Sequence, residues 1–370
     1  MRAPRWRVAA TRAPSRRVAA GLLAVVLAVS LAGCTGDGEG GGDGLTVGLL
    51  LPSRAVPRWE QSDKPLIEKR VKELCSECTV VYANAENDAA SQRRQMNSMI
   101  TRGVSVLILD VVDPRALRSS VRAAERAGIP VVAYDRLAEG PISGFVSFDG
   151  GEVGRLQGEA LLRGMGARAD GGTVVMMNGD PSSPNAAWYE GGARSVLQDR
   201  VRIAKSYNTL GWRTENAHDH MSAAIDALGP DGIDGVLAAN DSIAAGVVAA
   251  LKSARVSPLP AVTGQDADLD AVRRIVGGEQ YMTVYKPFRL ETDAASALAV
   301  ALARGNDVDA LVTTSVDSPT TRDVPSILLR PITVTRENIG RTLVQDGIYT
   351  IDQICTPKLR PDCDRAGLTR

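Results

Sequence analysis

The sequence predicts an α/β protein made of two doubly wound, parallel-sheet lobes joined by crossover hinge strands. Short runs rich in Val, Ile and Leu alternate with longer helix-like stretches about eight times from Leu45 onward. Runs that are apolar at nearly every position are typical of strands buried on both faces, as in parallel sheets, and their alternation with helices indicates the α/β class. The strands are too many for one comfortable sheet, which favours two lobes.

The expected strands are the apolar runs themselves, and they lie at residues 45–51, 79–83, 104–110, 129–135, 172–178, 201–207, 233–239, 260–266 and 282–286. Helices are expected between them, for example over 91–103 and 113–128. The second of these has Asp113 as its cap, Pro114 at its first position and Gly128 after its end, so we assign Asp113 no further role.

A length of 370 residues suits two domains. The segment 143–154 interrupts the strand–helix rhythm, and we expect the chain to cross between the lobes there. The predicted N-terminal lobe comprises residues 45–145 and 287–327, and the predicted C-terminal lobe comprises residues 146–286 and 328–370.

Residues 1–33 form an expected signal peptide. They carry six arginines and no acidic residue, and the apolar run Val18 to Leu31 is too short for a confident membrane span. The pair Arg16-Arg17 suggests twin-arginine export, but the residues that follow it fit poorly, so this route and the general secretory route both stay open.

The end of this segment, Leu31-Ala32-Gly33-Cys34, resembles the lipobox of bacterial lipoproteins, in which the cysteine is acylated after cleavage. An ordinary signal peptide is the alternative. Residues 34–44 are then the lipidated Cys34 and a flexible glycine-rich tether. We therefore expect a body held at the outer face of the cytoplasmic membrane or in the periplasm.

Four cysteines remain after Cys34, and an even number in an exported chain suggests disulfides. The local pairings Cys75–Cys78 and Cys355–Cys363 are favoured, although the sequence leaves cross-pairings open.

Metal, cofactor and nucleic acid are not expected as partners. The Cys75–Cys78 motif has no second CxxC or CxxH, and His218 and His220 stand two residues apart, so they do not share a helical face. Without residues 1–33 the chain has 37 basic and 43 acidic groups, a net charge of −6. A net charge of this sign gives no indication of the basic surface that nucleic-acid-binding proteins have.

Polar and aromatic residues follow the predicted strand ends, where ligands bind in open α/β sheets. They are Arg54, Arg58, Trp59, Asp135, Arg136, Asp180, Asn185, Trp212, Asn240, Asp241, Gln265, Asp266, Tyr285 and Lys286. Each sugar hydroxyl is both a donor and an acceptor, and an indole can pack against the C–H face of a sugar ring. This mixture of groups therefore suits a pyranose.

Some of these residues also have simple structural interpretations. Asp241 is equally well explained as a helix cap, and Asp268 is better explained as a cap or first-turn acid than as a ligand group. Trp59 and Trp212 stand beside arginines rather than within apolar runs, which favours a site over the core. We leave Trp188 unassigned.

At these positions the chain resembles the type I periplasmic sugar-binding family. The matching stretches occur in order over nearly the whole mature chain, at residues 58–59, 97–108, 131–136, 142–161, 211–212, 215–217, 239–241, 264–269, 282–287 and 323–332.

The resemblance implies sugar contacts by Arg58, Trp59 (stacking), Asp135, Arg136, Asn185, Trp212, Asn240, Asp266 and Lys286. Three departures from the family pattern matter. The loop before Trp59 is one residue longer, so Arg54 is an alternative to Arg58. Ser183-Pro184 replaces an acid, which leaves the identity of the sugar open. The tail that contains Cys355 and Cys363 looks like an addition.

The resemblance implies a monomeric sugar-binding lipoprotein without enzymatic activity. It would deliver xylose or a related monosaccharide to the permease of an ABC importer by hinge closure. A sugar sensor for a chemoreceptor or kinase is one alternative. The other is a secreted glycoside hydrolase using Asp135 and Asp266, which the basic or amide groups beside both carboxylates and the scarcity of histidine disfavour.

Overall fold

The computed structural model describes residues 44–369. The expectations for the signal peptide 1–33, the lipidated Cys34 and all of the tether but Gly44 therefore lie outside the described residues. Residues 43–370 form one compact unit. Within the described part, no helix has the length and apolarity needed to cross a membrane.

The N-terminal lobe is built on one sheet, which has seven strands within residues 44–369 and the order β11-β12-β5-β4-β3-β1-β2. All neighbours are parallel except β11 and β12. The strands are β1 (Thr46–Leu51), β2 (Thr79–Asn84), β3 (Val106–Leu109), β4 (Val131–Tyr134), β5 (Gly144–Phe148), β11 (Thr314–Val316) and β12 (Val324–Leu329).

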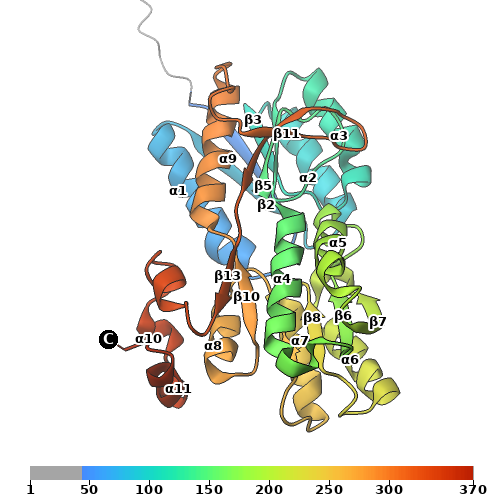
Figure 1. The fold of residues 1–370 in the computed structure, drawn as a ribbon. Helices are drawn as coiled ribbons and strands as arrows, with labels where there is room; N and C mark the ends of the chain where they lie inside the picture. Colours follow the sequence, from blue (N-terminus) through green and yellow to red (C-terminus); the bar gives the residue numbers. More distant parts are fainter. Residues whose placement is uncertain (1–43, 370) are drawn as a thin grey trace, which may run out of the picture. The chain divides into compact units, whose positions relative to one another are not determined.

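Helices cover both faces of this sheet (Figure 1). α1 (Lys64–Leu74) packs with α9 (Phe288–Ala303), and α2 (Ala89–Thr101) packs with α3 (Pro114–Arg126). Because both faces are covered, the central strands β3, β4 and β5 are buried at every position. This burial explains why their sequences are apolar runs rather than alternating patterns. As expected, Asp113 caps α3, accepting hydrogen bonds from two backbone amides.

The C-terminal lobe contains, within the same described range, a parallel four-stranded sheet of order β7-β6-β8-β9 and an antiparallel pair β10-β13. A bridge from Gln265 to Val284 connects the two sheets. The strands are β6 (Thr173–Asn178), β7 (Arg202–Asn208), β8 (Gly235–Ala238), β9 (Ala261–Val262), β10 (Met282–Tyr285) and β13 (Ile332–Thr335). Their helices are α4 (Gly150–Met165), α5 (Pro184–Leu197), α6 (Thr214–Leu228), α7 (Asp241–Ser253) and α8 (Leu269–Gly277).

Shorter elements complete the chain. They are η1 (Trp59–Asp63), η2 (Gly166–Ala169), η3 (Leu210–Trp212), η4 (Gly340–Val344), α10 (Ile351–Ile354), η5 (Pro357–Leu359) and α11 (Arg360–Arg365). The structure has the two local disulfides that the sequence favours, Cys75–Cys78 and Cys355–Cys363. The second disulfide closes a loop over residues 355–363, which lies beside α8.

The chain passes between the lobes after β5, after β10 and after β12, so the α/β class with two parallel-sheet lobes is confirmed. The first passage falls within the expected segment 143–154. The expected boundaries at 145 and 327 lie inside β5 and β12, and both strands pair over their whole length in the N-terminal sheet. The chain therefore leaves that lobe a few residues later than the sequence predicts.

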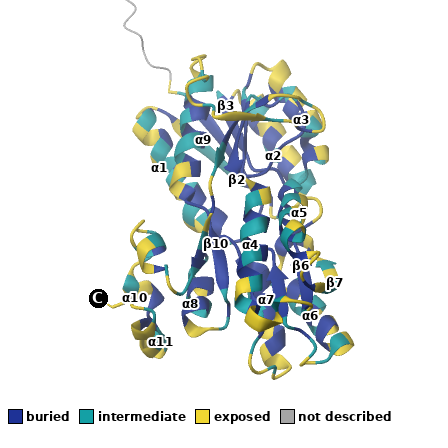
Figure 2. Cartoon of the chain, in the orientation of Figure 1, coloured by how far each residue is buried: buried dark blue, intermediate teal, exposed yellow. Residues whose placement is uncertain are grey.

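Two strand predictions differ from the structure. The run 260–266 yields only the two-residue β9, because the backbone turns into left-handed conformations at Asp266 and Ala267. Four strands, β5, β11, β12 and β13, have no counterpart among the predicted strands. Figure 2 shows that burial is concentrated in the sheets and the inner helix faces, while the outer helix faces are exposed.

Candidate functional site

The carboxyl ends of strands from both lobes meet at a cleft. Its lining consists of Val56, Trp59, Asp135, Arg136, Ser183, Asn185, Tyr189, Trp212, Asn240, Gln265, Asp266 and Lys286. Every residue implied by the resemblance is in this lining except Arg58, which lies directly behind it.

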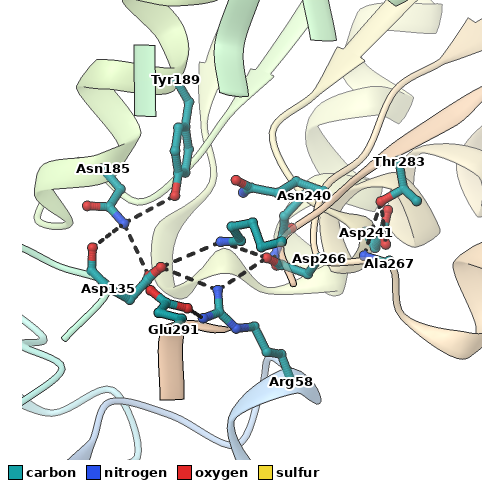
Figure 3. A network of polar contacts seen from close by, with 12 residues as sticks. Arg58, Asp135, Asn185, Tyr189, Asn240, Asp241, Asp266, Ala267, Thr283 and Glu291 are labelled. Carbon is teal, nitrogen blue, oxygen red and sulfur yellow. Dashed lines mark hydrogen bonds and ion pairs between the residues drawn. The ribbon is translucent and has the colours of Figure 1, made fainter. Parts of the chain in front are cut away.

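Two carboxylates from opposite lobes share the same cations at this cleft (Figure 3). Asp135 follows β4, and Asp266 follows β9. The Lys286 Nζ lies 3.5 Å from Asp135 Oδ1 and 3.0 Å from Asp266 Oδ1. Arg58 Nη1 lies 3.3 Å and 3.8 Å from the same two oxygens. Lys286 itself lies in the crossover between β10 and α9, so the ion pairs connect both lobes and a hinge.

Arg58 is fully buried behind the cleft and is held from several sides. Its Nε donates to Asp63 Oδ2 at 2.9 Å, and its Nη2 donates to Glu291. Its guanidinium lies 4.4 Å from the ring centre of Trp59 and 4.8 Å from that of Phe288. Burial alone would lower the pKa of Arg58, but the carboxylates around it raise that pKa above its usual value, so the group is a fixed cation.

Burial would raise the pKa of Asp135, yet Lys286, Arg58 and Arg136 outweigh that effect and hold the pKa below its ordinary value. The Asp135 carboxylate is therefore ionised near neutral pH. Burial and Arg58 would lower the pKa of Lys286, but Asp135 and Asp266 raise it overall. An ionised Asp135 accepts hydrogen bonds and is not suited to be a general acid.

Arg136 is the other cation of the N-terminal side. Its Nε lies 3.4 Å from Asp110 Oδ1, and its Nη1 donates to the Val111 carbonyl at 3.3 Å. Its guanidinium carbon is 5.9 Å from the ring centre of Trp59. Trp59 therefore has cation–π contacts with two arginines, which help to hold its indole in place.

Asn185 connects α5 to the N-terminal lobe. It follows Pro184, the first residue of α5, and its Nδ2 donates to Asp135 Oδ2 at 3.2 Å and to the Asp135 carbonyl at 3.1 Å. The same nitrogen is 3.1 Å from the hydroxyl of Tyr189. Tyr189 lies one helical turn after Asn185, on the same face of α5.

The side chain of Asn240 makes two hydrogen bonds at the start of α7. Its Oδ1 accepts from the backbone amide of Ile243 at 3.0 Å and caps the helix, while its Nδ2 lies 3.5 Å from Asp266 Oδ2. The prediction that Asp241 could be this cap is wrong. Asp268 does occupy the N-cap position of α8, but its side chain makes no capping hydrogen bond.

Asp241 instead turns into the interior of the C-terminal lobe. Its carboxylate accepts from the Asp268 amide at 3.0 Å, from Thr283 Oγ1 at 2.9 Å and from Gln280 Nε2 at 2.8 Å. Burial raises the pKa of Asp241 to about 7. This carboxyl group is structural.

Three lining residues have backbones in the left-handed region although none is glycine. The φ angles are 55° at Asp135, 57° at Trp212 and 95° at Asp266. Such conformations cost about 1–3 kcal/mol each and cluster at functional sites. Asp180 supports the turn before Trp212 by accepting from the Gly211 amide at 2.5 Å, which gives this predicted strand-end residue a structural role.

The cleft leaves donors and acceptors unused. Among the residues that the structure describes, the buried atoms without a hydrogen-bond partner include Trp59 Nε1, Ser183 Oγ, Asn185 Oδ1, Trp212 Nε1 and Gln265 Oε1. An unpaired buried polar group costs about 1–3 kcal/mol. A concentration of such groups in one cleft indicates a site for a ligand with both donors and acceptors.

The structure distinguishes Arg58 from Arg54. The side chain of Arg54 is 54% exposed and pairs with Glu86 and Glu60 outside the cleft, whereas that of Arg58 is 0% exposed. Trp188 lies beside Phe145, with ring centres 6.4 Å apart, and does not line the cleft. Tyr285 packs edge-on against Phe288 behind the site.

Sequence reasoning missed Tyr189, Val56 and the role of Glu291. Tyr189 could have been found from its spacing, because it follows Asn185 by four residues on a predicted helix. Glu291 is on α9, far from any strand end, and had no comparable signal. Within residues 44–369, no group of His, Cys, Asp and Glu is arranged to hold a metal ion.

Comparisons with known proteins agree on one family. The periplasmic binding protein domain matches residues 47–307. The D-xylose-binding periplasmic protein of Escherichia coli is 34% identical over 309 residues, which cover 82% of this chain and 90% of that protein. The multiple sugar-binding periplasmic receptor ChvE of Rhizobium radiobacter is 30% identical, with 84% and 92% covered.

The fold is similar to that of an ABC transporter solute binding protein from Clostridium phytofermentans, solved with bound β-D-glucose. The TM-score is 0.78 at 30% identity, and the match covers 84% of this chain and 99% of that one. A carbohydrate transporter solute binding protein from Chloroflexus aurantiacus, in complex with D-glucose, has a TM-score of 0.77 at 27% identity, with 84% and 98% covered.

Proposed function

Because the chain belongs to the periplasmic binding protein family, we propose that it is an extracytoplasmic receptor for a neutral monosaccharide of an ABC importer. The relatives named above are binding proteins and not hydrolases. The chain is accordingly a binding protein, and the glycoside hydrolase alternative is set aside.

The observation that carries the proposal is the set of groups that converge on the cleft. Asp135 and Asp266 supply charged acceptors, Lys286 and Arg136 supply charged donors, and five buried polar atoms are left without partners. Hydrogen bonds to charged groups contribute about 1.5–3 kcal/mol each. Several of them offset the cost of removing a sugar from water.

We propose xylose or a related aldose as the ligand. The relatives named above bind xylose, glucose or several sugars, and the donors and acceptors that line the cleft of this chain suit the hydroxyl groups of such a sugar. Ser183-Pro184 stands where the family carries an acid, so the specificity of this chain need not copy that of the xylose-binding relatives.

In the proposed mechanism, the sugar stabilises contact between the lobes. Asp135, Arg136 and Arg58 belong to the N-terminal lobe, while Trp212 and Asp266 belong to the C-terminal lobe. A ligand that bonds to both sets favours closure in proportion to its differential affinity. The closed monomer would then dock on the permease; docking on a chemoreceptor or kinase is the alternative use of the same closure.

A ligand screen by thermal shift, followed by calorimetric titration, tests the proposal. A sugar that binds only the native state raises the melting temperature, and we expect this for at least one pentose or hexose. Lys286→Met should abolish the shift, whereas Lys252→Met, which alters an exposed ion pair with Glu279, should retain it. No shift and no heat with any aldose would overturn the proposal.

We also propose that Cys34 is acylated and anchors the receptor. The support is the sequence Leu31-Ala32-Gly33-Cys34 followed by the glycine-rich stretch. Expression of the full chain with a labelled fatty acid should give a labelled, membrane-associated protein, and Cys34→Ser should give an unlabelled one. Label that persists in Cys34→Ser would contradict the assignment.

A further inference from the structure

The turn that presents Asp266 to the cleft has an unusual backbone. Asp266 and Ala267 are consecutive non-glycine residues with φ of 95° and 55°. Neither conformation is favourable for such residues without outside support. The position of the Asp266 carboxylate therefore depends on what holds this turn.

Part of the support comes from β10. The Asp266 amide donates to the Val284 carbonyl at 2.9 Å, and the Ala267 amide donates to Thr283 Oγ1 at 3.2 Å. Both bonds are donated by backbone amides of the turn. The Ala267 carbonyl, which is an acceptor, is bonded by a different element.

That element is the C-terminal segment, residues 340–369. The hydroxyl of Tyr349 donates to the Ala267 carbonyl at 3.0 Å. The Ala267 side chain is fully buried in one apolar cluster with Ile354, Cys355 and Cys363 of the same segment. The segment thus contacts the turn both by a hydrogen bond and by packing.

The same segment also reaches the strand that leads to Lys286. Burial and the nearby Asp346 carboxylate raise the pKa of Tyr285, the residue before Lys286. Tyr285 packs edge-on against Phe288, with ring centres 5.9 Å apart, and Phe288 lies under the Arg58 guanidinium. The C-terminal segment therefore touches the immediate neighbours of both members of the Asp266–Lys286 ion pair.

The segment is itself fixed to the C-terminal lobe. Arg273 of α8 donates to the Gln353 carbonyl through Nη2 at 2.7 Å and through Nε at 3.1 Å, and the Cys355–Cys363 disulfide closes the segment. Figure 1 shows α10 and α11 beside α8, away from the N-terminal lobe. The segment is therefore a fixed part of the C-terminal lobe, and the turn at Asp266 and Ala267 packs against it.

We propose that the disulfide-closed C-terminal segment is a positioning element of the ligand site, with Tyr349 as the positioning residue for Asp266. The inference rests on the proposed sugar-binding function. Tyr349 touches no ligand, and it acts by holding the Ala267 carbonyl and with it the orientation of the Asp266 carboxylate.

The variant Tyr349→Phe removes only the hydroxyl. We expect the Kd for the sugar to rise about tenfold, as the loss of one buried hydrogen bond predicts. Tyr281→Phe is the matched control, because Tyr281 is on the same lobe but away from the cleft, and its Kd should equal that of the wild type. Equal Kd values for Tyr349→Phe and the wild type would overturn the inference.

Deoxy analogues separate positioning from general loss of structure. The analogue without the hydroxyl that pairs with Asp266, identified from Asp266→Asn, should bind Tyr349→Phe and the wild type equally. A merely destabilised protein would bind every analogue more weakly, and that result would also reject the inference. If the wild type binds no sugar at all, the proposed function fails first.

A second variant keeps the test decisive if Tyr349→Phe folds poorly. Asp346→Asn alters an exposed residue and weakens the contact with Tyr285. We expect its Kd to rise several-fold, with the loss confined to hydroxyls bonded by Asp266 or Lys286. An unchanged Kd in Asp346→Asn would show that the contact between Asp346 and Tyr285 does not position the ligand site.

Discussion

Two groups of polar residues, adjacent in sequence, face opposite directions in the C-terminal lobe. Asn240 and Asp266 line the cleft, whereas their neighbours Asp241 and Asp268 do not, and the Asp241 carboxylate accepts from the Asp268 backbone amide within the C-terminal lobe. The interior group is closed within one lobe, since the Asp241 carboxylate accepts from three donors there. The cleft group shares its partners with the other lobe through Lys286 and Arg58.

This contrast indicates that the fold separates stability from binding at the ends of two neighbouring strands, β8 and β9. A group whose hydrogen bonds are all satisfied within its lobe stabilises that lobe and has nothing to offer a ligand. A group that faces the cleft is surrounded by unpaired polar atoms, and a ligand is needed to supply their missing hydrogen bonds. The following substitutions test whether the two groups can be separated in this way.

The largest effect is expected behind the cleft, where Arg58 neutralises buried carboxylates. Arg58→Met leaves Asp63 and Glu291, both with fully buried side chains, without their cation, and should lower the free energy of unfolding by about 3–5 kcal/mol. Urea denaturation measures this loss. Adding Glu291→Gln should recover part of it.

Arg54→Met is the matched control for this prediction, because Arg54 lies four residues earlier and is 54% exposed. We expect its effect to stay within about 0.5 kcal/mol. Similar losses of unfolding free energy in Arg58→Met and Arg54→Met would show that the buried ion pairs of Arg58 stabilise the protein no more than exposed ones do.

The interior group should affect stability more than any neighbouring acid. Asp241→Ala removes the acceptor of three hydrogen bonds inside the lobe and should cost about 3 kcal/mol. Asp270→Ala, whose side chain is 78% exposed, should cost less than about 0.5 kcal/mol. Equal costs in urea denaturation would remove the distinction between the interior and exposed positions.

The interior group also predicts a pH dependence. Native Asp241 keeps its proton up to a pKa of about 7, whereas the unfolded chain releases it near pH 4. Unfolding therefore releases a proton between these values, and the free energy of unfolding falls as pH rises, by at most about 1.4 kcal/mol per pH unit.

Burial also raises the pKa of Asp63, to about 6, and this adds to the same trend below that pH. Asp241→Asn should make the slope between pH 4 and 7 shallower, as measured by urea denaturation at several pH values. An unchanged slope would mean that Asp241 is ionised throughout.

The smallest predicted effect concerns Asn240, a member of the cleft group that also caps α7. Asn240→Ser keeps an oxygen that can cap α7 but loses the amide donor beside Asp266. Sugar affinity should fall about tenfold with little change in melting temperature. Asn216→Ser, outside the cleft, is the control, and a matching loss of affinity there would contradict the assignment.

The fold could be predicted largely from the sequence because strands buried on both faces leave an apolar run. Strand β9 was overestimated, since the run 260–266 continues into a turn whose positive φ angles have no sequence signal at Asp266 and Ala267. The edge strands β11 and β13 are partly exposed and short, and such strands lack the apolar run altogether. The strands β5 and β12 were also missed, because Gly and Ser in GFVSF and Pro and Ser in VPSILL interrupt the apolar run.

The convergence of the candidate residues could be predicted where they follow strands but not elsewhere. Asp135, Asn240 and Asp266 lie at strand ends, and the structure brings them to one cleft. Sequence could not show that Asn240 rather than Asp241 caps α7, because both residue types are good caps. Glu291 pairs with Arg58 from a distant helix, and only the folded chain reveals that contact.

Calorimetric titration of Asp266→Asn and Asp268→Asn with the sugar found by the ligand screen tests the central claim most directly. Asparagine tolerates the positive φ at position 266, so the change removes charge rather than shape. We predict that Asp266→Asn raises the Kd about a hundredfold and that Asp268→Asn leaves it unchanged. Wild-type affinity in Asp266→Asn would contradict the account.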